Sequence, residues 1–168
     1  MKSDNNFPEF ENIINEMTYV YKHDNRPWLI GYSGGKDSSL LVTLVVETVL
    51  RLPEYARTKK IFIVTSDTGV ENPVVKKYMH SSSEKINIFS KKVRANIQAD
   101  IIYPDVTQSF WSLIIGLGYP TPEPPGFRWC TERLKILPMN KYTNSLIEQY
   151  GDCLLYTSPS PRDMRRSR

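Results

Sequence analysis

The chain has 168 residues, of which 40% are apolar and 24% charged, a composition typical of a globular domain rather than a disordered or fibrous protein. Its formal net charge is +4, but arginines and aspartates beyond residue 151 contribute half of that excess, so the charge indicates little about a nucleic-acid partner. Two cysteines exclude a disulfide-rich secreted scaffold. Because we find no signal peptide and no long apolar run, we expect a cytoplasmic protein without membrane association.

The first third of the chain alternates helix and strand patterns. Residues 7–23 repeat apolar side chains at helical spacing, with Pro8 in the first turn. Residues 28–32 are a short apolar run typical of a strand, and residues 38–51 are long enough to favour a buried helix. Residues 61–65 are entirely apolar except for the final threonine, which predicts a strand buried on both faces of a parallel sheet.

The turn between the first strand and the second helix is the most informative segment. It reads Ser33-Gly34-Gly35-Lys36-Asp37-Ser38-Ser39. Two glycines allow a tight turn in which several N–H groups point at one anion at the helix N-terminus. Lys36 adds a point charge, and the hydroxyls of Ser38 and Ser39 add donors. We predict a pyrophosphate cradle, distinct from the common P-loop because an aspartate follows the lysine; a glycine-rich turn without a ligand is the alternative.

A polar segment, residues 66–73, follows the second predicted strand. Since the carboxyl ends of parallel strands meet at one edge of the sheet, we expect Asp67 and Thr68 to lie beside the phosphate loop, close to a bound nucleotide. An ordinary turn with a helix N-cap is the alternative, because Asp, Thr, Gly, Asn and Pro all favour turns.

The rest of the chain continues the alternation. We predict a long amphipathic helix over residues 72–96, a strand over 101–103, and helices over 108–117, 131–137 and 141–150. This order predicts an α/β fold in three layers, with a parallel sheet and helices on both faces.

Two further segments bear on chemistry. Residues 119–127 contain four prolines, which favour a stiff extended connection, either a substrate-positioning lid or a plain linker. Directly after it, Arg128 and Lys135 are suited to gripping phosphates. Cys130 lies among Arg128, Arg133 and a helix start, all of which favour the thiolate. A buried, inert cysteine is the alternative.

The C-terminal segment differs from the rest. Residues 153–163 read Cys-Leu-Leu-Tyr-Thr-Ser-Pro-Ser-Pro-Arg-Asp and resemble a sequencing-library adapter read in frame; a Pro/Ser/Arg-rich disordered tail is the alternative. We therefore expect an N-terminal helix over residues 1–24, a nucleotide-binding domain over 25–151, and a disordered adapter-like segment over 152–168. The natural reading frame is expected to continue past Gly151, so the domain would be incomplete at its C-terminus.

The phosphate loop resembles that of the PP-loop ATP pyrophosphatase superfamily, whose fold is of the adenine nucleotide alpha hydrolase type. Over residues 25–150 the chain is similar to the DndC family, the phosphoadenosine phosphosulfate reductase-like sulfurtransferases of DNA phosphorothioation. The residues that carry this resemblance are the phosphate loop after Gly31-Tyr32, Asp67-Thr68 with Val70-Glu71-Asn72-Pro73, Phe110-Trp111, Gly118-Tyr119-Pro120, and the run Phe127-Arg128-Trp129-Cys130-Thr131-Glu132-Arg133-Leu134-Lys135.

The resemblance implies an enzyme that cleaves ATP to AMP and pyrophosphate to activate a DNA backbone phosphate for sulfur insertion. It implies Mg²⁺, an iron–sulfur cluster with Cys130 as first ligand, and a cysteine desulfurase and other DNA phosphorothioation subunits as partners. The other cluster cysteines would lie beyond this chain, so we expect the chain alone to be inactive. The residues expected at the nucleotide are Ser33, Gly34, Gly35, Lys36, Asp37, Ser38, Ser39, Asp67, Thr68, Arg128 and Lys135, and those expected in catalysis are Lys36, Asp37 and Cys130.

The residues leave alternatives open. Asp37 is suited either to a metal ion or to bracing the loop. A reductase of adenylyl sulfate compounds would share the same phosphate loop and would need a redox cysteine further along the chain. A non-catalytic module that binds an adenine nucleotide would need the loop alone.

Overall fold

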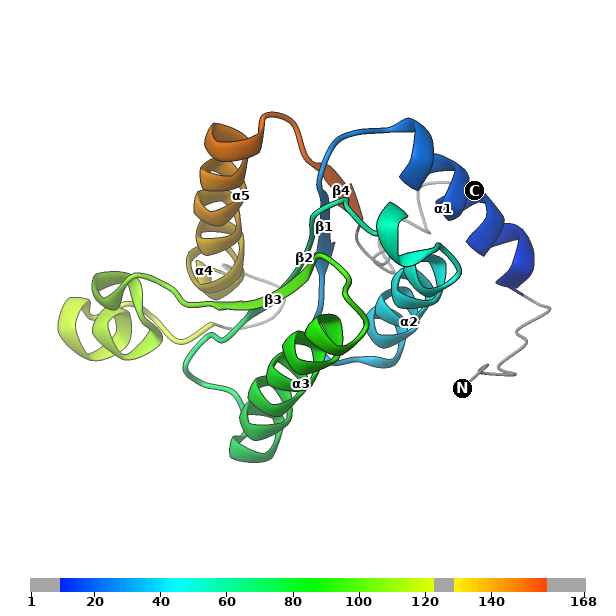
Figure 1. Cartoon of the computed structure of the whole chain (residues 1–168). Helices are drawn as coiled ribbons and strands as arrows, with labels where there is room; N and C mark the ends of the chain where they lie inside the picture. The colour runs from blue at the N-terminus through cyan, green and yellow to red at the C-terminus, as the bar shows by residue number, and fades with distance from the viewer. Residues whose placement is uncertain (1–9, 123–128, 157–168) are drawn as a thin grey trace, which may run out of the picture.

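A four-stranded parallel sheet forms the centre of the molecule (Figure 1). The computed structural model describes residues 10–122 and 129–156. The strands are β1 (Trp28–Gly31), β2 (Ile61–Ser66), β3 (Ile97–Ile102) and β4 (Leu154–Tyr156). Their order in the sheet is β3-β2-β1-β4, and every neighbouring pair is parallel.

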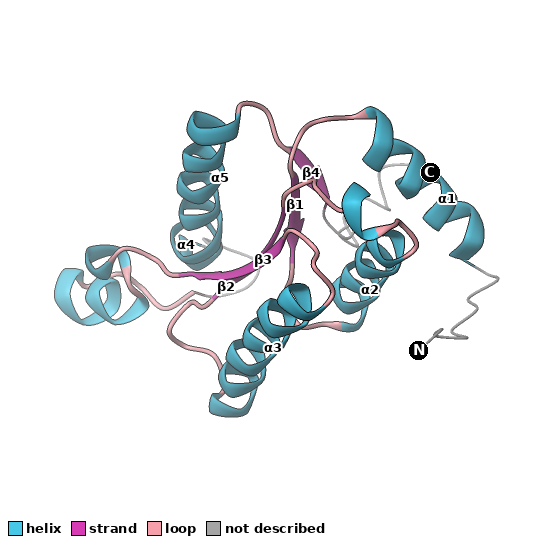
Figure 2. Ribbon diagram, viewed as in Figure 1, coloured by secondary structure: helices cyan, strands magenta, loops and turns pink. Residues whose placement is uncertain are grey.

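Helices cover both faces of this sheet (Figure 2). On one face lie α1 (Glu11–His23), α2 (Lys36–Leu50) and α3 (Pro73–Lys92); the other face is covered by α5 (Leu137–Tyr150). The α/β class and the parallel sheet with helices on both faces are thus confirmed. Among the helices in the described ranges, none is both long and apolar enough to cross a membrane.

The two faces of the sheet bury separate cores. Along β2, Ile61 and Ile63 pack toward α1 and α2, whereas Phe62 and Val64 pack toward Leu146 of α5. Successive strand side chains point to opposite faces, and both faces are covered. This is why β1 and β2 have continuous apolar sequences rather than alternating ones.

The boundary between α3 and β3 differs from the prediction. The helix ends at Lys92 rather than near residue 96, and β3 begins at Ile97 rather than at residue 101. Between them, Arg94 adopts a positive φ of 51°, which breaks the helix. The strand starts earlier because Ile97 pairs with Ile61 at the beginning of β2, a contact that local periodicity cannot reveal.

The two helices expected over residues 131–137 and 141–150 are one continuous helical segment. It comprises α4 (Trp129–Thr131), the π-helical turn η5 (Glu132–Ile136) and α5. Pro138 lies inside it and has no N–H to donate to the carbonyl of Leu134 as an α-helix requires. The hydroxyl of Ser66 donates to that carbonyl instead, at 3.1 Å. A wider π-helical turn and a tertiary hydrogen bond therefore accommodate the proline.

Short helical turns occupy the remaining connections. They are η2 (Glu54–Ala56), η3 (Val106–Gln108) and the π-helical η4 (Ser112–Gly116). The last two, with the flanking turn, account for most of the helix predicted over residues 108–117. They form a lobe that projects beyond β3, on the left of Figure 1.

The expectation that the chain beyond residue 151 takes no part in the fold is wrong for β4. Leu154–Tyr156 pair in parallel with Trp28, Leu29 and Ile30 of β1, and the Leu154 N–H donates to the Pro27 carbonyl at 2.8 Å. The open edge of β1 offers unpaired backbone groups, and an apolar three-residue run satisfies them. Residues 157–168 lie outside the described part of the chain.

Candidate functional site at the carboxyl edge of the sheet

The carboxyl ends of β1 and β2 open on a cavity of about 320 Å³. Ligands of open parallel sheets bind at this edge. The cavity lies between the phosphate loop, the first turns of α3 and the η5–α5 junction. Its lining consists of Gly31, Tyr32, Ser33, Ser38, Val64, Ser66, Glu71, Val75, Met79, Lys135 and Met139.

The phosphate loop is closed by its own serines. Ser38 is buried; its hydroxyl accepts from the Ser33 N–H at 3.3 Å, lies 3.1 Å from the Ser33 hydroxyl and donates to the Gly35 carbonyl at 3.0 Å. The loop thus places Gly35 at the N-cap of α2, followed by Lys36 at its first helical position. The first N–H groups of a helix have no intrahelical acceptor, so they are available to an anion. Ser38, predicted as a phosphate donor, instead holds the loop.

Gly34 makes this loop geometry possible. Its φ is +75°, and a Cβ built on it would lie 3.3 Å from the Tyr78 ring on α3. Only glycine adopts this backbone conformation at no steric cost. The tyrosine that packs here is itself fixed, because the Tyr32 and Tyr78 hydroxyls lie 3.5 Å apart.

The charged residues of the loop are free to meet a ligand. Lys36 and Asp37 are exposed, and neither forms an ion pair or side-chain hydrogen bond within the described ranges. Of the two roles open to Asp37, loop bracing is carried out by Ser33 and Ser38 instead. Ser39, half-buried one turn further on, donates its N–H to the Gly35 carbonyl at 2.9 Å.

Asp67 is the most buried charged group in this region, with no exposed surface. Its carboxylate accepts from the Gly69 N–H at 2.9 Å and lies 3.3 Å from both Lys76 Nζ and His80 Nε2. Burial alone raises the pKa of Asp67, but these three partners outweigh it and hold the pKa below its usual value. These partners favour the ionised carboxylate, and they occupy its oxygens, so Asp67 binds protein groups rather than a ligand.

The segment after β2 therefore mostly supports the walls of the cavity, and only part of it lines the cavity. Asp67 and Thr68 were predicted at the nucleotide, yet neither lines the cavity. Thr68 donates to the Glu71 carboxylate at 2.9 Å, and Glu71 does line the cavity. Sequence reasoning missed His80. Its spacing from Lys76, one helical turn, places both side chains on the face of α3 that meets Asp67, and this was the available signal.

Lys135 reaches the cavity from the opposite side, as predicted. The Ser66–Leu134 hydrogen bond fixes the backbone beside it to the end of β2. Lys135 is exposed and, like Lys36, has no ion pair among the described residues. Lys135 thus lines the cavity without an ion-pair partner among the described residues, whereas Lys36 is exposed at the start of α2 and does not line it.

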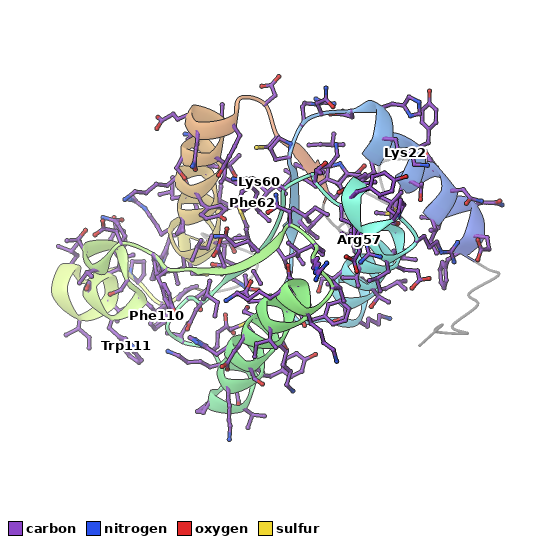
Figure 3. The ribbon with its side chains drawn as sticks, in the orientation of Figure 1. Lys22, Arg57, Lys60, Phe62, Phe110 and Trp111 are labelled. Carbon is purple, nitrogen blue, oxygen red and sulfur yellow. The ribbon has the colours of Figure 1, made fainter. Side chains whose placement is uncertain are left out.

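The segment around Cys130 is tied to the projecting lobe rather than to the cavity. Trp129 donates its ring N–H to the Pro120 carbonyl at 2.9 Å, and its ring stacks on Phe110, whose place in the lobe Figure 3 marks. Arg133 donates to the Gln108 side chain at 2.7 Å. Cys130 is half-buried and does not line the cavity. Arg128 and most of the proline-rich segment lie outside the described residues.

The described residues do not fit an iron–sulfur cluster. Such clusters take four cysteine or histidine ligands, whereas no group of three or more His, Cys, Asp or Glu side chains within residues 10–122 and 129–156 is arranged to hold a metal ion. The other cysteine, Cys153, packs at the edge of the core beneath α5, where burial raises the pKa of its thiol.

A larger cavity, of about 650 Å³, lies at the opposite edge of the sheet. It shares no lining residue with the first and includes none of the predicted site residues. Because Ser33 and Ser38 of the glycine loop and Lys135 line the smaller cavity, at the edge of the sheet where α2 begins, we take the smaller one as the candidate nucleotide site.

Comparison with known proteins gives one distant relative. The chain is similar to "Uncharacterized protein MJ0066" of Methanocaldococcus jannaschii, with 28% identity over 144 residues, 86% of this chain and 25% of that protein. The chain thus spans about a quarter of the length of the curated relative that it matches. No protein-family model matches the chain, and no solved structure matches it.

Proposed function

We propose that this chain is the nucleotide-binding part of an ATP-dependent sulfurtransferase of DNA phosphorothioation, with a PP-loop type fold. One observation carries the proposal: the glycine turn from β1 into α2 contributes Ser33 and Ser38 to a cavity that Lys135 also lines, and Lys36 is exposed at the start of α2. A triphosphate is the ligand that this combination of oriented N–H groups and uncompensated positive charge favours.

The chain's own residues account for cleavage between the α and β phosphates. Negative charge builds on the departing pyrophosphate when a nucleophile attacks the α phosphorus. We propose that the N–H groups at the start of α2 and the Lys36 ammonium meet that charge and stabilise it without reorganising. Lys135 would neutralise charge from the far side of the cavity.

The acids near the cavity suit a magnesium ion bound with the nucleotide. Mg²⁺ is usually held by one or two carboxylates together with substrate phosphates; Glu71 lines the cavity and Asp37 is exposed in the first turn of α2, and these are the carboxylates proposed for it. Bound there, the ion would share the charge of the phosphates.

The sulfur chemistry is proposed for a longer protein. The attacking group would be an oxygen of a DNA backbone phosphate, which would displace pyrophosphate and become adenylylated. A persulfide delivered by a cysteine desulfurase would attack the activated phosphorus through its outer sulfur, and AMP would leave with the adenylylated oxygen. A second thiol would then attack the sulfur of the persulfide carrier, forming a disulfide and releasing the phosphorothioate. Since the described residues do not fit an iron–sulfur cluster, no step of this chemistry is assigned to Cys130.

Product analysis tests the proposal. The chain is incubated with α-labelled ATP and Mg²⁺, with and without DNA, and binding is measured by calorimetry. We expect ATP binding that falls at least about tenfold in Lys36→Ala, as expected for losing a charged contact to phosphate, and AMP rather than ADP wherever turnover occurs. Lys77→Gln, which removes an exposed lysine of α3, is the matched control.

The outcomes separate the candidates. Binding without turnover by this chain, together with AMP release and phosphorothioate formation by the longer protein, supports the proposal. Binding without turnover by the longer protein as well would leave a non-catalytic nucleotide module. Reduction of adenylyl sulfate would identify the reductase alternative, and no ATP binding at all would contradict the site.

A further inference from the structure

The large cavity at the amino edge of the sheet has the chemistry of a binding site. It lies where the C-terminal ends of α1 and α5 and the loop before β2 meet, at the top of Figure 1. Its volume, about 650 Å³, is in the range of small-molecule sites. Its functional side chains are three lysines and three tyrosines: Lys22, Lys59, Lys60, Tyr21, Tyr55 and Tyr150.

The positive charge of this lining is uncompensated. Asp24 is the only carboxylate among the lining residues, and Arg26 occupies it at 2.6 Å, which lowers the pKa of Asp24 to about 2. None of the three lysines forms an ion pair with any described residue. By contrast, Arg51 pairs with Glu11 and Arg94 with Glu54.

Two of these lysines are held in place. Lys59 Nζ donates to the backbone carbonyls of Asp24 and Arg26 and lies 5.4 Å from the centre of the Tyr21 ring. Lys60 Nζ donates to the Tyr150 hydroxyl at 2.6 Å. An ammonium has three donors, so each lysine keeps at least one for a ligand while its position is fixed. Figure 3 marks Lys22 on α1 and Lys60 before β2, the two sides of this edge.

An aromatic platform stands beside these charges. Tyr55 is 84% exposed, so its ring contributes almost nothing to the fold. Positive charge next to an exposed aromatic ring is the arrangement that binds nucleic-acid units, with the base stacked on the ring and the phosphate near the cations.

We propose that the amino-edge cavity binds a nucleoside phosphate, with its phosphate among Lys22, Lys59 and Lys60 and its base on Tyr55. The ligand is either a free nucleotide or one unit of a single-stranded nucleic acid. This inference is independent of the function proposed for the carboxyl edge, which shares no lining residue with it.

Binding of thymidine probes tests the inference, because they lack the adenine and triphosphate expected at the other edge. A dye-labelled strand of about eight thymidines, within the size of typical single-strand sites, is titrated by anisotropy at two salt concentrations. Thymidine 5′-monophosphate is then added as competitor. A second strand carrying 5-iodouracil is photocrosslinked and the modified peptide identified.

We expect Tyr55→Ala and Lys22→Gln each to weaken binding by about five- to tenfold, as stacking and phosphate contacts do, and the crosslink to fall on Tyr55. Asp24→Asn, which frees Arg26, should strengthen binding by about twofold. The controls, Tyr103→Ala and Lys77→Gln, remove an exposed ring (55% exposed) and an exposed charge elsewhere, and each should change binding by less than twofold.

Competition by the monophosphate at millimolar concentration would identify a free nucleotide, and binding of the strand alone would identify a nucleic acid. No binding of either probe to the unaltered chain would overturn the inference. Equal weakening by the controls, or a crosslink elsewhere, would also overturn it, because binding would then be non-specific attraction to the basic surface.

Discussion

The two edges of the sheet present positive charge in different ways. At the carboxyl edge, the N-terminus of α2 presents backbone N–H groups beside a loop closed by Ser33 and Ser38, and neither Lys36 nor Lys135 has an ion-pair partner among the described residues. At the amino edge the charge comes from side chains alone, two of them already held by Tyr150 and by backbone carbonyls. Backbone donors form a fixed cradle suited to stabilising a transition state, whereas lysines and an exposed ring suit binding without chemistry.

Among substitutions that test this difference between the two edges, Gly34→Ala is expected to lower the stability of the chain most. A side chain at φ +75° costs about 1–2 kcal/mol, and its Cβ would meet the Tyr78 ring at 3.3 Å. We expect denaturant unfolding to show that loss of stability, and ATP binding to weaken because the cradle is distorted. Binding of the thymidine strand at the amino edge should not change.

Gly116→Ala is the control for that substitution. Gly116 has no atom within 4 Å of a built Cβ and no positive φ, so the change should be neutral or slightly stabilising. Equal destabilisation by both variants would show that the conformation of Gly34 is not the constraint.

Asp67→Asn is expected to lower the free energy of unfolding at neutral pH by somewhat less than Gly34→Ala does. Charge-assisted hydrogen bonds contribute about 1.5–3 kcal/mol when buried, but Lys76 and His80 are 49% and 40% exposed, so we expect about 1–2 kcal/mol after solvent screening. The carboxylate should contribute to stability because its hydrogen bond to Gly69 holds the loop that carries Glu71.

The pH dependence gives the sharper test of Asp67. Its folded pKa is lowered, so its contribution to stability is present above the unfolded pKa, about 4, and is lost as the pH falls through the folded pKa. The free energy of unfolding should therefore fall less steeply below about pH 5 in Asp67→Asn than in the unaltered chain. Glu84→Gln, an exposed acid on the same helix, should leave the slope unchanged; a matching change there would contradict the assignment.

Ser66→Ala has the smallest expected effect and is tested by a double-mutant cycle. The serine satisfies the Leu134 carbonyl, so its loss should cost about 1 kcal/mol. In a Pro138→Ala background the new N–H can serve that carbonyl, and the same substitution should then cost close to nothing. Unfolding in urea measures all four variants; equal costs in both backgrounds would show that the proline and the serine are not coupled.

Contiguous features of the fold and of the carboxyl edge could be predicted. The apolar runs of β1 and β2, the glycine turn and the start of α2 are each local, and Lys135, predicted to grip a phosphate, lines the carboxyl-edge cavity. Three features could not be predicted, since each depends on a partner far along the chain. They are the start of β3, the junction at Pro138 and the pairing of β4 with β1. The inward turn of Asp67 depends on His80, thirteen residues away.

The sequence by itself determined that the chain is α/β, that its sheet is parallel and that a glycine turn joins β1 to α2, because backbone conformation and apolar periodicity are local properties. Only the tertiary structure decided which polar groups meet. The Ser38 hydroxyl closes its own loop at the wall of the cavity, and Asp67 binds its own protein partners away from it. Cys130 packs with the lobe, and the amino-edge cavity gathers residues from three separate segments, 21–27, 55–60 and Tyr150. Hydrogen bonds and charges act over a few ångströms in space, and spacing along a chain does not determine those distances.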